Sequence, residues 1–189
     1  MKNEPNQNLT EVNGLILIRP LSATDDMAAL TGLIHAAYSK HAAKDLRYWA
    51  THQTPEDTAK RFALGHGLIA ELNGAIVGTI TVRPPQPESP IELFRDPDTW
   101  TLFQFAVSPQ FQGMGIGSRL HQAALTYAAA HGGRVIALDT AAPATDLIEF
   151  YRRWGYQVVG ECDWRPRTNY PSVILSRPIA ETKTLDKES

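Results

Sequence analysis

Runs of apolar residues divide the chain into short strands and amphipathic helices. Continuous or alternating apolar, β-branched segments predict strands at residues 15–19, 68–72, 75–82, 101–107, 135–139, 156–159 and 172–176. Apolar residues at helical spacing predict a helix from Met27 to Tyr38, a second after Thr54, and two more at 118–130 and 146–154.

Capping and turn residues place the boundaries of several of these elements. Thr54 and Pro55, with Asp57 following, form the pattern of a capping box at the start of a helix. Asn73-Gly74 between two strands predicts a tight hairpin. The segment 83–98 carries five prolines and predicts a long loop that is either functional or mobile.

The order of these elements predicts a mixed-sheet fold of the α/β or α+β class. The series β-α-α-β-β-β-α-β-α-β-β combines hairpins with at least one helical crossover, which indicates one domain. We expect this domain to span 13–178, between a flexible N-terminus at 1–12 and a flexible tail at 179–189.

Composition narrows the range of partners. The 189 residues are 43% apolar and 20% charged, with a net charge of −2, so we expect no binding to nucleic acid or to a membrane. Cys162 is the only cysteine, which excludes an internal disulfide and favours a reducing cytoplasm. The six histidines show no metal-ligand spacing, so we expect no metal, and His121 and His131 are expected to be solvated.

A glycine-rich turn is the most informative motif in the chain. Gly113, Gly115 and Gly117 lie between the strand ending at Val107 and the next helix, where free backbone N–H groups favour a phosphate. A P-loop requires Lys-Ser/Thr after the last glycine, but Ser118-Arg119 follows here. The spacing also disfavours the dinucleotide-binding fingerprint.

The third interpretation rests on a resemblance to a known family. Gln112-Gly113-Met114-Gly115-Ile116-Gly117 resembles the Gln/Arg-x-x-Gly-x-Gly/Ala signature of the GCN5-related N-acetyltransferases (GNAT superfamily). Phe150-Tyr151-Arg152-Arg153-Trp154-Gly155-Tyr156 resembles the Leu-Tyr-x-x-x-Gly-Phe/Tyr motif of the same family, and the order of elements fits as well.

The resemblance implies an acetyl-CoA-dependent transferase of the small-molecule or peptide type, with splayed central strands and direct acetyl transfer to a primary amine. It implies that Tyr151 protonates the leaving thiolate, since a phenol suits that group. The residues that it implies for acetyl-CoA binding are Phe105, Ala106, Val107, Gln112, Gly113, Met114, Gly115, Ile116, Gly117 and Ser118. A homodimer is common in the family.

The resemblance leaves the general base and the acceptor open. The central strand carries Gln104 where many members have Glu, so the candidate bases are a water chain or one of four carboxylates. These are Glu71, Glu92, Asp98 and Asp139. Ala144 stands where members often carry a cofactor-binding Asn. Both departures keep a second hypothesis open, a non-catalytic acyl-CoA sensor.

Two groups of residues are candidates for the acceptor site. Arg165 and Arg167 in the loop before the last strand favour an acceptor with a carboxylate or phosphate. The opposite wall is predicted to come from Tyr48, Trp49, Phe94 and Trp100.

Overall fold

The computed structural model describes residues 15–180. The flexible N-terminus predicted at 1–12 lies outside that range, as does the predicted tail 179–189 apart from its first two residues. The strands are β1 (Ile16–Pro20), β2 (His66–Leu72), β3 (Ala75–Arg83), β4 (Thr99–Val107), β5 (Val135–Ala141), β6 (Gln157–Asp163) and β7 (Pro171–Pro178). The α-helices are α1 (Met27–Ala42), α2 (Pro55–Phe62), α3 (Glu92–Arg95), α4 (Ile116–Ala130) and α5 (Thr145–Arg153). Two short 3-10 turns lie at Trp49–Thr51 and Pro109–Phe111.

The strands form one seven-stranded sheet in the order β1-β2-β3-β4-β5-β7-β6. All neighbours are antiparallel except β4 and β5, which are parallel because α4 crosses over between them. The predicted mixed-sheet α/β fold is therefore confirmed.

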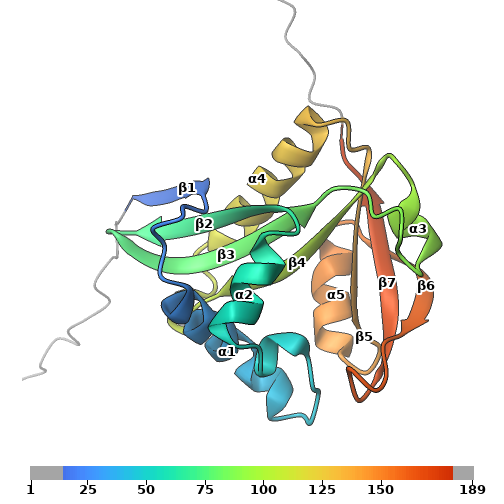
Figure 1. Ribbon diagram of the computed structural model, residues 1–189, viewed down its shortest axis with the longest axis horizontal. Coiled ribbons are helices and arrows are strands. Elements are labelled where there is room, and N and C mark those ends of the chain that lie inside the picture. The colour runs from blue at the N-terminus through green and yellow to red at the C-terminus, as the bar shows by residue number, and fades with distance from the viewer. Residues whose placement is uncertain (1–14, 181–189) are drawn as a thin grey trace, which may run out of the picture.

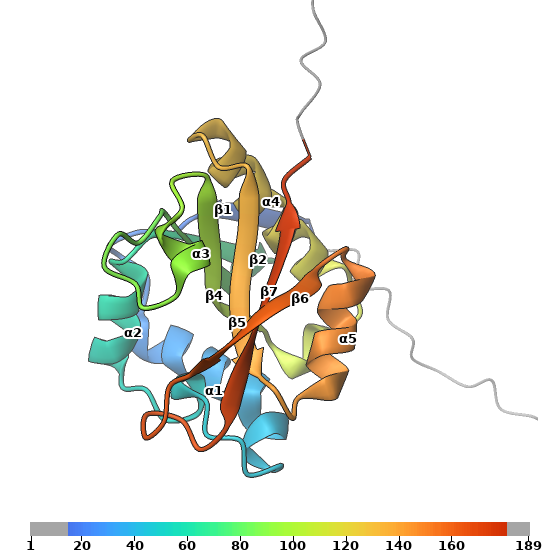
Figure 2. The same cartoon turned by 90° about the vertical axis from the view of Figure 1, so that its right-hand side faces the viewer.

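Helices cover both faces of this sheet (Figure 1). The largest apolar cluster joins α4 and α5 to one face, through residues such as Leu120, Ile148 and Leu138. Three smaller clusters lie on the other face, under α1, α2 and α3. Figure 2 shows α2 and α3 on one side of β4 and β5, and α5 on the other. The sheet thus separates two surfaces that can carry different chemistry.

Local signals in the sequence correctly place several boundaries. Thr54 and Asp57 form the predicted capping box on α2, and Asp26 accepts bonds from two N–H groups at the start of α1. Asn73 and Gly74 both have positive φ, as a two-residue hairpin turn requires. The helix predicted at 118–130 begins two residues earlier, at Ile116.

The proline-rich segment 83–98 is not the plain loop that its composition predicts. It contains the single turn of α3, and Ile91 and Phe94 are buried beside Ala137 and Ile174. No side chain caps the helix and its apolar period is too short to detect. Burial of Ile91 and Phe94 against the sheet therefore determines the conformation of this segment.

Candidate active site

The central strands β4 and β5 separate after a short region of pairing. They pair only at Thr99–Val135, Trp100–Ile136 and Thr101–Ala137. Beyond this point β5 continues against β7 alone, and β4 continues against β3 (Figure 1). The edge of β4 from Leu102 to Val107 is therefore open on the side of β5, as the predicted splay requires. An open strand edge offers backbone groups to an extended ligand.

The glycine turn supplies a row of free N–H groups beyond this edge. None of the six N–H groups from Gly113 to Ser118 donates to a protein acceptor within residues 15–180. Gly113 has φ +83° and Gly115, the N-cap of α4, has φ +77°, and a Cβ on either would point into open space. Unpartnered N–H groups at the positive end of a 15-residue helix fit a pyrophosphate.

The other residues predicted to bind acetyl-CoA gather at the same place. Gln112 donates from Nε2 to the carbonyl of Val107 (3.2 Å) and so ties the turn to the end of β4. A Cβ on Gly117 would lie 3.4 Å from the ring of Phe105. Ile116, by contrast, is fully buried in the core, so only its backbone can contribute to binding.

Tyr151 lies on α5, on the face of the sheet that α4 also covers. Its side chain is 7% exposed, and its hydroxyl makes no hydrogen bond with the described residues. Burial, with the nearby tyrosines Tyr38, Tyr156 and Tyr48, raises the pKa of Tyr151 well above its ordinary value. The phenol is therefore protonated at neutral pH, as a proton donor must be.

The structure separates the four carboxylates considered as a base. Glu71 accepts two hydrogen bonds from Arg19 on the distant strand β1. Asp98 precedes β4 at its paired end, 3.9 Å from Arg134. Glu92 belongs to α3 and lines a cavity there. Of the four, Asp139 alone lies on the separated part of β5.

Asp139 combines contact with solvent and a raised pKa. Its side chain is reached by solvent, yet desolvation by the surrounding protein raises the pKa of Asp139. The indole Nε1 of Trp164 donates to its Oδ2 (2.9 Å), and that bond and the charge of Arg61 oppose the rise in pKa. Asp139 shares the sheet face of Ala137 and Ala141, opposite to Tyr151.

The sequence names Asp139 and Tyr48 as site candidates, but it gives no signal for Tyr38 and Arg61 beside them. Tyr38, Arg61 and Tyr170 interact electrostatically with Asp139, and Tyr48 joins them by ring contacts of 5.4 Å to Tyr38 and 5.0 Å to Tyr170. We call these five residues the Asp139 cluster. They come from α1, α2, β5 and two loops, so no local motif in the sequence could reveal that they meet.

The predicted acceptor walls are only partly present. Tyr48 belongs to the Asp139 cluster, and its hydroxyl lies 2.9 Å from Oγ1 of Thr140. Trp100, however, packs in the core on the opposite face, near Tyr127 and Gly133. Trp100 therefore contributes nothing to this site. Phe94 belongs to α3 and is buried against Ala137 and Ile174.

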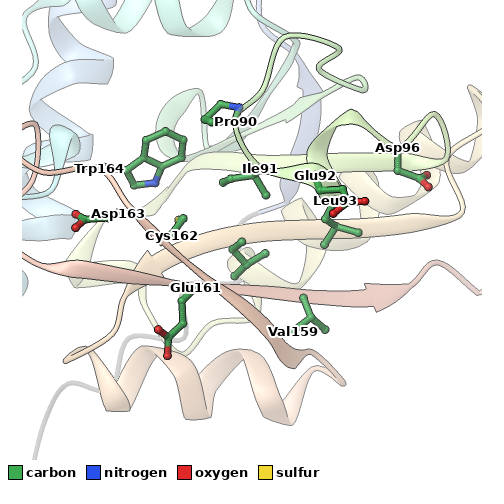
Figure 3. A pocket seen from close by; sticks show the side chains of 11 residues that line it. Pro90, Ile91, Glu92, Leu93, Asp96, Val159, Glu161, Cys162, Asp163 and Trp164 are labelled. Carbon is green, nitrogen blue, oxygen red and sulfur yellow. The ribbon is translucent and has the colours of Figure 1, made fainter.

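A cavity of about 730 Å³ lies between α3 and β6 (Figure 3). Trp164 lines the cavity at one end while its indole N–H donates to Asp139. Cys162 also lines it, and burial raises the pKa of this thiol to about 12. A protonated thiol is a poor nucleophile, so Cys162 is unsuited to a covalent acyl-cysteine step.

His121 differs from its predicted solvated position. It is 5% exposed, its Nε2 lies 2.8 Å from the Tyr156 hydroxyl, and its ring packs 4.4 Å from that of Trp154. Burial lowers the pKa of His121 to about 4, so the ring is neutral and belongs to the core.

The splayed strands and the free N–H groups of the turn define an acyl-CoA N-acyltransferase. Residues 30–156 match the model of the acetyltransferase (GNAT) family, so the chain belongs to that family. It is an acyltransferase, and acetyl-CoA is the acyl donor of the family. Acetyl-CoA is an extended molecule that contains a pyrophosphate. The free N–H groups of the turn suit the pyrophosphate, and the open edge of β4 suits the extended arm.

Individual proteins resemble the chain at low sequence identity. The chain is 28% identical over 149 residues to S-alkylcysteine N-acetyltransferase of Bacillus subtilis, which covers 75% of this chain and 79% of that protein. It is 26% identical over 139 residues to human N-acetylaspartate synthetase, covering 72% of this chain and 43% of that protein. The yncA structure of Salmonella typhimurium, solved with acetyl-CoA, has a TM-score of 0.62 at 20% identity, covering 92% and 99% of the two chains.

Within residues 15–180, no helix combines the length and the apolar character needed to cross a bilayer.

Proposed function

We propose that this protein transfers the acetyl group of acetyl-CoA to the primary amine of a small molecule or peptide. The observation that carries the proposal is the gap between β4 and β5, which has Tyr151 on one face of the sheet and Asp139 on the other. We call the turn at 112–118, the end of β4 and Tyr151 the donor side. We call the Asp139 cluster the acceptor side.

On the donor side, backbone groups hold the acyl donor. The free N–H groups of Gly113 to Ser118 bind the pyrophosphate, and the open edge of β4 pairs with the amides of the extended arm. The thioester then lies in the gap between the strands, near Tyr151.

On the acceptor side, Asp139 takes the proton that the ammonium must lose before attack. The amine nitrogen forms a bond to the thioester carbon, the carbon–sulfur bond breaks, and the Tyr151 hydroxyl supplies a proton to the leaving sulfur. The second proton that the nitrogen loses as the amide forms restores the Tyr151 hydroxyl. The raised pKa of Asp139 brings this carboxylate closer to neutral pH, which strengthens it as a base. Asp139 also provides a carboxylate in place of the Glu that many family members carry at the position of Gln104.

The names of the two curated relatives agree with a small acceptor, since each contains an amino acid, S-alkylcysteine or aspartate. Incubation with acetyl-CoA and a panel of amino acids, polyamines and peptides tests the proposal, with thiol release and the mass of the acetylated product as readouts. We expect release that depends on the acceptor. Acetyl-CoA binding without transfer to any amine would instead support the sensor hypothesis.

A further inference from the structure

Arg61 is a partly buried cation with no anionic partner in the described chain. Its side chain is of intermediate exposure, and none of the six ion pairs found in residues 15–180 includes it. Its Nη1 donates to Oε1 of Gln53 (3.0 Å), and its Cζ lies 5.5 Å from the centre of the Phe103 ring. The other N–H groups of its guanidinium have no partner among the described residues.

A buried hydrogen-bond network fixes the position of this guanidinium. Gln53 is 1% exposed, and its Nε2 donates to Oγ1 of Thr58 (2.7 Å) and to Oε1 of Gln104 (2.9 Å). Both amide protons are used, so Oε1 of Gln53 is left to accept from Arg61. The Arg61 side chain is therefore held in place before any ligand binds.

An irregularity in β4 supports the same arrangement. Gln104 has φ +49° at a bulge in the pairing with β3. As a result, Phe103 contacts Arg61 and Gln104 contacts Gln53, so two successive side chains face α2. A regular strand would turn one of them to the opposite face. The bulge thus helps to position Arg61, because it turns both Phe103 and Gln104 toward the Arg61–Gln53 pair.

The charges of Arg61 and Asp139 form a complementary pair for a zwitterion. Burial lowers the pKa of Arg61, which shows that its charge is partly desolvated. Asp139 and Asp57 attract it, but neither carboxylate lies within ion-pair distance. A desolvated cation without a close partner is unfavourable unless an anion binds it. Arg61 lies near Asp139, the carboxylate that the proposed function assigns to the ammonium group of the acceptor.

We infer that Arg61 binds the carboxylate of a free α-amino acid while the α-amine of the same molecule reaches Asp139. The inference rests on the proposed function. A guanidinium presents paired N–H donors that match a carboxylate, and a small amino acid carries both charges within one short molecule. The amine of a peptide N-terminus lacks an adjacent carboxylate, so a peptide would leave Arg61 unpaired.

The arginines predicted from the sequence fit this role less well. Arg165 already bonds both carboxylate oxygens of Asp163, with distances between 2.6 and 3.0 Å. Arg167 is exposed in the same loop, and its side chain makes no hydrogen bond or ion pair within residues 15–180. Arg167→Gln therefore serves as the matched control for Arg61→Gln.

The test compares an amino acid with its primary amide, which keeps the amine and removes the charge. After a panel has identified the best amino acid acceptor, kcat/KM is measured for both forms in the wild type, Arg61→Gln, Arg61→Lys and Arg167→Gln. The carboxylate-to-amide ratio is compared between proteins, so that the different basicity of the two amines cancels. We expect Arg61→Gln to lower this ratio by about 10- to 100-fold, Arg61→Lys to lower it less, and Arg167→Gln to leave it unchanged.

Other outcomes overturn the inference in distinguishable ways. If the wild type uses other amines but no free amino acid, the inference fails and the proposed function stands. An unchanged ratio in Arg61→Gln, or a loss caused by Arg167→Gln instead, also overturns it. Transfer to no amine at all removes the proposed function and the inference together. Activity of each variant on the amide shows that it is folded.

Discussion

The donor side and the acceptor side of the sheet are encoded in different ways. The donor side comes largely from one contiguous segment, β4 through the turn to α4, and binds its ligand mainly with backbone groups. The acceptor side is assembled from side chains far apart in the sequence, such as Tyr38, Arg61 and Asp139. A common acyl donor requires a constant backbone site, whereas the acceptor is chosen by side chains that can vary without changing the fold.

The largest effect is expected on the acceptor side. Asp139→Asn removes the base, so kcat/KM should fall by roughly 100- to 10,000-fold, while the affinity for acetyl-CoA stays the same. Steady-state kinetics and a binding titration measure the two quantities. Asp98→Asn is the control, because that exposed carboxylate lies at the paired end of β4 and should leave both unchanged. Weakened acetyl-CoA binding in Asp139→Asn would contradict the separation of the two sides.

The matching change on the donor side is Gly115→Glu, which places a carboxylate at the pyrophosphate. We expect acetyl-CoA to bind at least about 100-fold more weakly. Gly132→Glu carries the same backbone strain, since Gly132 has φ +89° and open space around its Cβ, but it lies at the other end of α4. Thermal shift with acetyl-CoA compares the two, because a ligand at a hundred times its Kd stabilises by roughly 2.7 kcal/mol. An equal ligand shift in both variants would show that the turn is not the site.

A smaller effect is expected from Tyr151→Phe, which also separates an enzyme from a sensor. Loss of the proton donor should lower kcat by about 100-fold, toward the lower end of the range for general acids, because a thiolate is a moderately good leaving group. Acetyl-CoA affinity should change little. Single-turnover kinetics with saturating acetyl-CoA isolate the transfer step. A transfer rate equal to that of the wild type would remove Tyr151 from the reaction.

The smallest expected effect is a shift in pH dependence from Trp164→Phe. The indole N–H stabilises the charged form of Asp139, so its loss raises the pKa of Asp139 further. Because the base acts when deprotonated, the acidic limb of the kcat/KM profile should move to higher pH. At high pH the two proteins should reach the same plateau. A shift to lower pH would contradict the assignment of Asp139 as the base.

The sequence predicts the donor side better than the acceptor side for a physical reason. Caps, the Asn73-Gly74 turn and the glycine motif act through neighbouring residues, so the sequence carries their effect directly. The Asp139 cluster depends on how α1 and α2 pack over the splayed strands. The sequence therefore names Asp139 only as one of four candidate carboxylates. It does not indicate Arg61 at all, because the position of Arg61 depends on the bulge at Gln104.

Two predictions from the sequence overlooked a specific partner, and the one for His121 is wrong. His121 looks like a surface residue of an amphipathic helix, but it is buried against Tyr156, which lies after α5. Arg165 looks like a free anion-binding group, but it pairs with Asp163 two residues earlier. In both cases a specific partner changes the role that composition alone suggests. The predicted homodimer stays a prediction.

Hydrogen exchange followed by mass spectrometry, with and without acetyl-CoA, tests the separation of the two sides most directly. The account predicts that acetyl-CoA slows exchange at the N–H groups of residues 113–118 and along the end of β4. Segments that carry Arg61 and Trp164 should respond only when an acceptor is added. Protection of the acceptor side by acetyl-CoA alone, with residues 113–118 unchanged, would contradict it.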